Sequence, residues 1–170
     1  MLLLGLGSNL SSSFGDRFEN LNLATVYLQE YKIKIIKRSS FYETPSYPDT
    51  KNPKFINIVV EVSTSLSPED LASVLLFVEK KLGRKRIKKN EPRTCDIDII
   101  DYNGKVMNFT YKNLIFKVPH EKIIYRNFVL FPLQEIAPKW VHPMNKDSID
   151  VLIKKLSNEE KKSILKITKA

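Results

Sequence analysis

Two aspartates stand two positions apart in "EPRTCDIDII", residues 91–100, a segment that otherwise has the apolar pattern of a strand. Aspartate is disfavoured in strands, and two like charges on one face repel each other. On a strand, Asp96 and Asp98 point to the same face with Cα atoms roughly 6.5–7 Å apart, while Ile97 and Ile99 face the core. Such a pair can share hard cations, because Mg²⁺ typically takes one or two carboxylates together with phosphate oxygens and water. A site for two ions, about 3.5–4 Å apart, suits this spacing. The alternative is a sheet face whose aspartates meet only water and lysines.

Positive side chains gather directly upstream of this strand, in and after the run "GRKRIKK" at 83–89. A guanidinium is planar, permanently charged and suited to phosphate oxygens, so a basic loop beside a carboxylate strand can surround a metal–polyphosphate. A solvated charge run paired to acids is the plainer explanation, but it does not explain why the run adjoins an acidic strand. The chain has neither G-x-x-x-x-G-K-[ST] nor G-x-G-x-x-G, so side chains and metal would hold the phosphates. The positive residues are Arg84, Lys85, Arg86, Lys88, Lys89 and Arg93.

Length and composition favour one globular domain over residues 1–170. The net charge of +9 indicates a polyanionic partner: nucleic acid, a membrane surface or a phosphorylated small molecule. A single cysteine, Cys95, excludes an internal disulfide and a cysteine-rich metal cluster, and its apolar surroundings predict a small core residue. No apolar stretch reaches the roughly 18–20 residues of a membrane span, and the start lacks a basic leader region, so a cytoplasmic protein is the default prediction.

Periodicity and capping residues predict the elements that must position the carboxylates. Asp16 and Glu19 have the spacing of a capping box that opens a helix, and Ser67 with Pro68 opens another that ends at Gly83. Strands are predicted for 2–7, 32–44, 54–62 and 95–100, the third with clean alternation. The resulting order is strand–helix–strand–strand–helix–strand, which predicts an α+β, ferredoxin-like antiparallel sheet with helices packed on it.

The remainder of the chain is less regular. Residues 105–147 are predicted to hold short strands and a helix near 126–136, and residues 148–168 one or two amphipathic helices that close the fold.

Six short blocks of sequence occur in the order found in one enzyme family. The blocks are "GLGSNL" (5–10), "FYETP" (41–45), "FIN" (55–57), "PRTCDIDII" (92–100), "VPH" (118–120) and "RNFVLFPLQEIAP" (126–138). With these blocks the chain resembles 6-hydroxymethyl-7,8-dihydropterin pyrophosphokinase, an enzyme of folate biosynthesis that moves pyrophosphate from ATP to a pterin alcohol and releases AMP. The resemblance covers roughly residues 2–143, and its most specific motif is P-R-T-x-D-[IL]-D-I.

The resemblance implies the family's ferredoxin-like α+β fold and a set of site residues on the phosphate side. It implies that Asp96 and Asp98 bind two Mg²⁺ ions that bridge the ATP phosphates, and that Arg84, Arg93 and Asp98 support the transfer. The residues that it implies for ATP binding are Glu79, Arg86, Arg93, Ile99, His120 and Arg126.

For the pterin, the resemblance implies five residues: Thr44, Pro45, Phe55, Asn57 and Phe128. Phe55 and Asn57 share one strand face, so a ring and an amide can meet one flat polar heterocycle. Asn57 can both donate to and accept from its amide-like edge, and Phe55 and Phe128 can sandwich the ring by offset stacking. Plain core packing is the alternative for both phenylalanines.

Two departures from the family pattern concern grip on the substrate rather than the metal pair. The family often has a tryptophan near the end of the basic loop, where this chain has Asn90 and Glu91, and an aromatic after "VPH", where it has Glu121. The loop is also about one residue short, which bears on the assignment of Arg84. We expect the reaction to survive and loop closure to differ.

The expected mechanism is in-line attack of the pterin hydroxymethyl oxygen on the β-phosphorus of ATP, with positioning and charge neutralisation as the protein's contribution. Two alternatives stay open: a basic ferredoxin-like module that binds nucleic acid, and a D-x-D metal-dependent nuclease or nucleotidyltransferase. The RNA-recognition pattern is missing, and acidic residues on the sheet would repel a phosphate backbone. We therefore expect no nucleic-acid or membrane partner, and a monomer by resemblance to the family.

Overall fold

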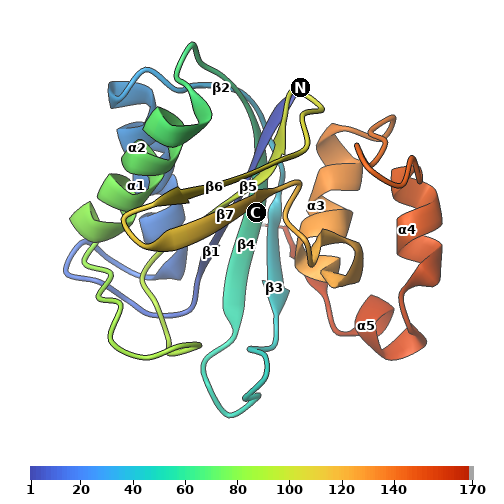
Figure 1. Cartoon of the computed structure of the whole chain (residues 1–170). Coiled ribbons are helices and arrows are strands. Elements are labelled where there is room, and N and C mark those ends of the chain that lie inside the picture. The colour runs from blue at the N-terminus through green and yellow to red at the C-terminus, as the bar shows by residue number, and fades with distance from the viewer. Residues whose placement is uncertain (169–170) are drawn as a thin grey trace.

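The computed structural model describes residues 1–168, and its centre is a six-stranded sheet with helices on both faces (Figure 1). Its strands run in the order β5-β1-β4-β3-β8, with β2 also paired to β4, and all of these pairs are antiparallel. This arrangement confirms the α+β ferredoxin-like prediction. The strands are β1 (Leu2–Ser8), β2 (Lys34–Arg38), β3 (Phe41–Thr44), β4 (Phe55–Ser63), β5 (Asp96–Tyr102) and β8 (Leu165–Ile167).

The segment 32–44, predicted as one strand, forms the two strands β2 and β3, which both pair with β4. The chain breaks between them at Ser39, whose backbone N–H donates to the carbonyl of Val59 over 2.9 Å. The Ser39 hydroxyl accepts from the backbone N–H of Val59 over 3.0 Å. The serine side chain thus takes over a hydrogen bond that a continuous strand would have made through its backbone.

Helices α1 (Arg17–Glu30) and α2 (Pro68–Lys81) cover one face of the sheet, and α3 (Asn127–Ile136), α4 (Ile149–Lys155) and α5 (Asn158–Lys162) lie on the other side (Figure 1). The predicted caps are present. Asp16 forms a capping box with Glu19, and the Ser67 hydroxyl accepts from the backbone of Asp70. Gly83 follows α2 with a φ of 89°, a left-handed conformation that favours glycine.

Strand alternation divides the apolar residues between two cores. On β4, Ile56, Ile58 and Val60 pack with α1 and α2, while Val59 packs with α3 and α4. On β5, a register shift opposite Leu3 and Leu4 adds a residue to the strand, so Ile97 and Ile99 join the first core and Ile100 the second. Asp96 and Asp98 therefore point to the face that carries α3.

A separate hairpin lies beside the edge strand β5. It consists of β6 (Met107–Tyr111) and β7 (Leu114–Val118), followed by the short 3-10 helix Ile123–Tyr125. The Tyr111 hydroxyl donates to the Ser73 hydroxyl of α2 over 2.9 Å, which fixes the hairpin across that helix. Within residues 1–168, no helix is both long and apolar enough to cross a membrane.

The C-terminal segment is only partly helical, which corrects the prediction for 148–168. Helices α4 and α5 form, but Leu165–Ile167 is strand β8 and pairs with β3. The edge of β3 offers unpaired backbone N–H and C=O groups, and pairing with β8 satisfies them. Earlier in the sequence than this segment, the Trp140 indole donates to the buried carboxylate of Asp101 over 2.8 Å. This hydrogen bond connects the chain after α3 to the end of β5.

Candidate functional site

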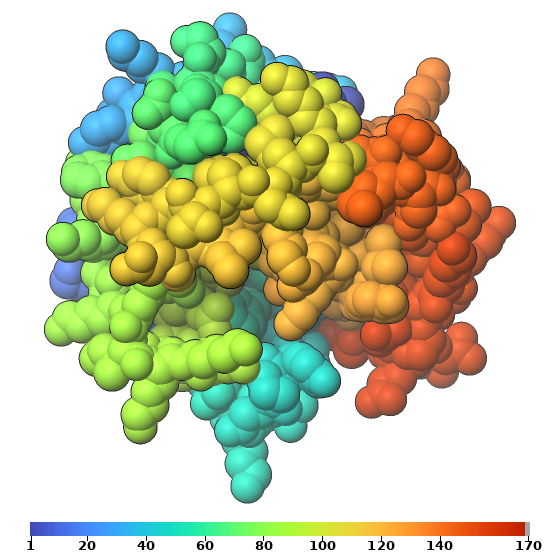
Figure 2. All heavy atoms as spheres, viewed as in Figure 1, coloured from blue at the N-terminus to red at the C-terminus, as the bar shows by residue number. Residues whose placement is uncertain are grey.

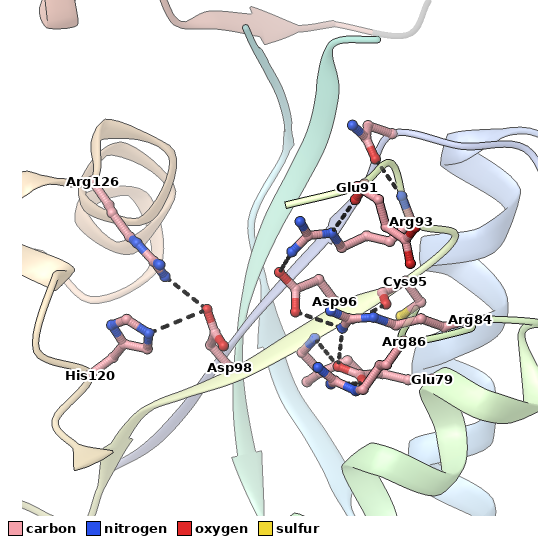
Figure 3. A network of polar contacts seen from close by, with 12 residues as sticks. Glu79, Arg84, Arg86, Glu91, Arg93, Cys95, Asp96, Asp98, His120 and Arg126 are labelled. Carbon is pink, nitrogen blue, oxygen red and sulfur yellow. Dashed lines mark hydrogen bonds and ion pairs between the residues drawn. The ribbon is translucent and has the colours of Figure 1, made fainter. Parts of the chain in front are cut away.

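Asp96 and Asp98 project side by side from β5, as their spacing predicts (Figure 3). Each carboxylate is partly exposed, with 29% and 33% of its side chain accessible, whereas Ile97 and Ile99 are buried. The neighbouring strand β1 places glycines directly opposite them, Gly7 beside Asp96 and Gly5 beside Asp98. The predicted Cys95 core position is confirmed, and burial raises the pKa of its thiol well above the ordinary value.

Asp96 is held by two arginines of the basic loop. Arg84 Nη1 lies 2.9 Å from Oδ1, and Arg93 Nη1 lies 3.2 Å from Oδ2 (Figure 3). Burial of the carboxyl group raises its pKa, but the charges of Arg84 and then Arg93 outweigh that effect and lower the pKa of Asp96. Asp96 is therefore an anion already neutralised by protein cations.

A third carboxylate, Glu79 of α2, lies beneath this pair. Only 2% of Glu79 is exposed, and it accepts from the backbone N–H of Ile97 over 2.8 Å. Its Oε1 lies 2.9 Å from Arg84 Nη1 and its Oε2 lies 2.6 Å from Arg86 Nη2. Burial, followed by the charge of Asp96, raises the pKa of Glu79 to about 7. The structure thus places this predicted ATP-binding residue against the root of the basic loop, bonded to protein groups.

Asp98 has its own pair of partners, from the other side of the site. Arg126 Nη1 donates to Oδ2 over 2.8 Å, and His120 Nε2 lies 3.9 Å from the same oxygen (Figure 3). Burial lowers the pKa of His120, so the ring is neutral near pH 7. Its Nδ1 accepts from the backbone N–H of Lys122 over 3.1 Å, which leaves the proton on Nε2. His120 therefore presents a neutral N–H donor to the space beside Asp98.

A hollow of about 340 Å³ opens between β5 and the β6–β7 hairpin, and a second of about 330 Å³ lies under the basic loop. Both aspartates line the first, and Arg86 and Leu114 line both, so the two hollows adjoin each other (compare the recess between the loop and the hairpin in Figure 2). The size is in the range of small-molecule sites. Of the residues predicted to bind ATP, Arg86, Ile99 and His120 line this hollow.

The aromatic side chains predicted to bind the pterin lie next to the same arginines. The Arg93 guanidinium carbon is 5.7 Å from the centre of the Phe55 ring, and that of Arg126 is 5.3 Å from the centre of the Phe128 ring. Each ring therefore contacts the arginine that holds one of the two aspartates.

The polar residues predicted for the pterin lie at the adjoining ends of β3 and β4. Asn57 and Thr44 are buried and hydrogen-bonded to each other over 2.9 Å, and exposed Pro45 follows Thr44 at the start of a loop. The partly exposed aspartates line the hollow, and only Gly7 of β1 lies between Asp96 and Asn57 in the sheet. Residues predicted for the pterin and residues predicted for ATP therefore lie on either side of the two aspartates.

Sequence reasoning assigned no role to Asn9, which connects three loops. This residue is 2% exposed, and its Oδ1 accepts from the backbone N–H of Arg93 over 2.7 Å. Its own N–H donates to the Arg93 carbonyl over 3.1 Å, and its Nδ2 donates to the Pro53 carbonyl over 3.1 Å. Asn9 lies inside the "GLGSNL" block, and its position just after a buried strand was the available signal.

The carboxylates of Asp96 and Asp98 are the donors that limit which metal ion could bind at this site. In the described residues 1–168, no three His, Cys, Asp or Glu side chains gather closely enough to form a metal site. A cation caged by protein alone does not fit this donor set. Mg²⁺ shared between one or two carboxylates and the phosphates of a nucleotide does fit, because such an ion keeps several non-protein ligands.

Paired carboxylates that can share Mg²⁺ with phosphates, together with arginines on both sides and a hollow alongside, fit an enzyme that transfers a group from a nucleoside triphosphate, where positioning and neutralisation of charge carry the catalysis. Over residues 3–138 the chain matches the family described as 7,8-dihydro-6-hydroxymethylpterin-pyrophosphokinase (HPPK). The chain belongs to this family, which confirms the resemblance seen in the sequence.

Several relatives bear related names. A 2-amino-4-hydroxy-6-hydroxymethyldihydropteridine pyrophosphokinase of Aquifex aeolicus is 38% identical over 141 residues, which are 83% of this chain and 82% of the relative. A folic acid synthesis protein fol1 of Pneumocystis carinii is 36% identical over 162 residues, 95% of this chain but 21% of the relative. The solved HPPK-DHPS of Plasmodium falciparum with pterin and p-hydroxybenzoate has a TM-score of 0.72 at 17% identity. That match covers 97% of this chain and 46% of the Plasmodium chain, and it supports the fold alone.

Proposed function

We propose that this chain transfers the pyrophosphoryl group of ATP to 6-hydroxymethyl-7,8-dihydropterin, giving the pterin diphosphate and AMP for folate synthesis. Family membership and the names of relatives such as the Aquifex enzyme support this reaction. The observation on which it rests is that Asp96 and Asp98 line a hollow of about 340 Å³ and are each paired with an arginine that lies against an aromatic ring, Arg93 against Phe55 and Arg126 against Phe128.

The reaction is an in-line displacement at the β-phosphorus. A bond forms from the pterin hydroxymethyl oxygen to that phosphorus while the bond to the oxygen of the α-phosphate breaks, and AMP leaves with that oxygen. The hydroxyl proton is lost, and we infer that Asp98, which lines the hollow, accepts it. When bound, Mg²⁺ would draw charge from the phosphates and lower the pKa of the hydroxyl. Asp96 and Asp98 would hold it, sharing it with the nucleotide.

The arginines gain their role by changing partners. Arg84 is bonded both to Asp96 and to Glu79, so it keeps a carboxylate when Asp96 turns to a cation. Arg93 has Asp96 as its carboxylate, and its Nε donates only to the Glu91 carbonyl over 3.1 Å. We infer that Arg93 is then free to bind the transferring phosphate, while Arg84 stays at the base of the loop beside it.

On the other side of the hollow, His120 and Arg126 would bind the remaining phosphate oxygens. His120 offers a neutral N–H and Arg126 a permanent positive charge, both within 4 Å of Asp98. Arg86 and Ile99 border the same space and would contact the nucleotide further along it. These donors neutralise charge without competing for the proton of the attacking hydroxyl.

The alternatives receive less support from the same residues. A nucleic-acid module would place phosphates against a sheet face that carries two carboxylates, which repel them. A nuclease or nucleotidyltransferase would use the aspartates but has no need of the buried Asn57 and Thr44 pair. A monomeric state and a location in the cytoplasm stay predictions.

The test is the formation of AMP from ATP by the purified chain with Mg²⁺, with and without 6-hydroxymethyl-7,8-dihydropterin. We expect AMP and the pterin diphosphate in equal amounts, only when the pterin is present, and none after chelation of the metal. AMP or pyrophosphate formed without the pterin would instead favour a nuclease or hydrolase. No reaction in the complete mixture would refute the proposal.

A further inference from the structure

The first residue of α3 is bonded through its side chain to the end of α5. Asn127 is 9% exposed, and its Nδ2 donates to the Glu160 carbonyl over 2.7 Å and to the Ser163 hydroxyl over 3.0 Å. The Ser163 hydroxyl in turn donates to the Glu160 carbonyl over 3.1 Å. The last four carbonyls of a helix have no partner within that helix, so the Asn127 amide supplies a partner for one of those of α5. The two N–H groups of one buried amide thus fix where α3 begins relative to α5.

Asn127 lies between two residues that the site uses. Arg126, before it, donates to Asp98 over 2.8 Å. Phe128, after it, has a ring whose centre is 5.3 Å from the Arg126 guanidinium carbon. Among the described residues 1–168, no side chain caps the start of α3 by a hydrogen bond. The contact of the Asn127 amide with α5 therefore takes the place of a cap in fixing the start of this helix.

The same C-terminal segment is also anchored to β3. Leu165 comes two positions after Ser163 and pairs with Glu43, and Lys166 pairs with Tyr42, so the chain runs from α5 directly to the edge of the sheet (Figure 1). Two residues of extended chain span at most roughly 7 Å. The anchor on α3 and the anchor on β3 therefore cannot move far apart.

A second connection joins the other end of α3 to the same strand. Glu135 accepts from the backbone N–H and the hydroxyl of Ser40, each over 2.9 Å, and from the Tyr42 hydroxyl. The Nζ of Lys166 lies 3.4 Å from the same carboxylate. Both ends of α3 are thus fixed relative to β3, the far end directly and the first turn through the C-terminal segment.

We propose that residues 157–167, the C-terminal brace, fix the start of α3 relative to the pterin side of the sheet, with Asn127 and Ser163 as positioning residues. The inference rests on the proposed function, under which the pterin lies between Phe128 of α3 and Phe55 of β4. Because β4 pairs with β3, a shift of α3 relative to β3 changes the width of that slot. The C-terminal brace prevents such a shift.

The two neighbours of Asn127 should respond unequally to the loss of the C-terminal brace. The ring of Phe128 has two side-chain torsions and moves with the backbone of α3. The long side chain of Arg126 has many rotamers, so it can keep its bond to Asp98 after a small shift of the helix. Loss of the brace should therefore weaken binding of the pterin and slow the reaction, and leave the affinity for the nucleotide nearly unchanged.

Substitutions at the two positioning residues test this expectation. Asn127→Ala removes both hydrogen bonds of the amide, and we expect it to raise the Kd for 6-hydroxymethylpterin about fivefold and to lower kcat about tenfold, because small misplacements near the reacting groups are costly. Ser163→Ala should give a smaller loss in the same direction, and Ser163→Thr, which keeps the hydroxyl, should restore the parent values. The double variant should lose no more than Asn127→Ala alone, since both residues act through one contact.

Gln134→Ala is the matched control. Gln134 lies near the other end of α3, and its Nε2 donates to Asp150 of α4 over 2.7 Å. The substitution removes an amide hydrogen bond between α3 and a C-terminal helix without altering the C-terminal brace. We expect kcat and the Kd for the pterin to stay within about twofold of the parent values.

The measurements are kcat for AMP formation, the Kd of 6-hydroxymethylpterin from its fluorescence in the presence of Mg²⁺ and a non-hydrolysable ATP analogue, and the Kd of that analogue alone. A thermal melt of each variant reports folding. If Asn127→Ala fails to fold, the comparison of Ser163→Ala with Ser163→Thr decides.

The failures are distinguishable. No AMP formation by the unsubstituted chain with the pterin would refute the proposed function. An active parent whose Asn127→Ala and Ser163→Ala variants melt at a lower temperature but keep kcat and both Kd values would overturn the positioning role and leave the function standing. An equal loss of affinity for pterin and analogue, or the same loss in Gln134→Ala, would also overturn it.

Discussion

The phosphate side and the pterin side of this site lie on different strands of one sheet and are built by opposite means. On the phosphate side, Asp96 and Asp98 are neutralised by arginines that come from a loop and from the start of α3. On the pterin side, Asn57 is neutral and is held by Thr44 of the adjacent strand. One side must exchange ion pairs before a charged ligand can bind, whereas the other already has its final hydrogen bonds.

The difference follows from the charge of what each side would bind. Burying unpaired carboxylates and guanidiniums is costly, so in the free protein they pair with each other. A neutral heterocycle requires only hydrogen-bond partners and a complementary surface, and strands supply both without an exchange of ion pairs. Substitutions on the phosphate side should therefore alter turnover most, and those on the pterin side mainly affinity.

Asp98→Asn should give the largest effect. It removes the charge that attracts the metal and leaves Arg126 without its carboxylate, so we expect kcat for AMP formation to fall by about a thousandfold or more. The thermal melt should change little, because the side chain is one-third exposed. Asp150→Asn, on α4 and away from the site, is the control. Retention of a tenth of the parent activity would contradict the metal role.

Arg93→Ala comes next. If Arg93 leaves Asp96 to bind the transferring phosphate, its contact strengthens in the transition state, and kcat should fall by about a hundredfold while the Kd for ATP changes far less. Steady-state kinetics with a separate binding measurement distinguishes the two. Arg38→Ala, whose guanidinium bonds Asn22 on the far side of the sheet, is the matched control. A change confined to KM would reject this role.

Glu79→Gln tests whether the buried carboxylate is retained for function at a cost in stability. Its folded pKa of about 7 lies above the ordinary 4.5, so the folded state binds the proton more tightly than the unfolded state. The parent chain should therefore lose stability as pH rises from about 4.5 to 7. We expect Glu79→Gln to melt at a higher temperature than the parent at pH 8 and at a similar one near pH 5, without metal. Its kcat should nevertheless be lower, because Arg84 and Arg86 lose their anchor. A parent chain that melts higher than the variant at pH 8 would contradict the assignment.

Local patterns were enough to predict the frame of the site. A period of two places Asp96 and Asp98 on one face, and capping residues such as Asp16 and Ser67 mark where helices begin, because both effects act within a few residues. Strand β8 was missed because its pairing depends on the free edge of β3, which lies far away in sequence.

The ion pairs of the two aspartates and the hydrogen bond between Asn57 and Thr44 also depend on distant segments. Asn9 and Arg93 are 84 positions apart, and nothing local to either one predicts that the Arg93 backbone N–H donates to the Asn9 side-chain oxygen while the Asn9 backbone N–H donates to the Arg93 carbonyl. Family resemblance supplied the names of Arg84, Arg93 and Glu79, but not that Glu79 lies buried beneath the arginines rather than open to a ligand. Tertiary packing determines which of several possible partners each of these side chains contacts.

Phe128→Leu should give the smallest effect and sharpens the contrast from the pterin side. Leucine keeps most of the apolar volume but removes the aromatic face, so the Kd for 6-hydroxymethylpterin should rise by about fivefold to tenfold. The Kd for the ATP analogue and the pairing of Arg126 with Asp98 should be retained, because that bond does not involve the ring. Phe77→Leu, on α2 where the ring packs edge-on against Tyr31, is the control for loss of an aromatic pair elsewhere. If Phe128→Leu weakened the binding of the ATP analogue and of the pterin equally, the two sides of the site would not be separable. The contrast between a phosphate side that exchanges ion pairs and a pterin side that is already arranged would then be wrong.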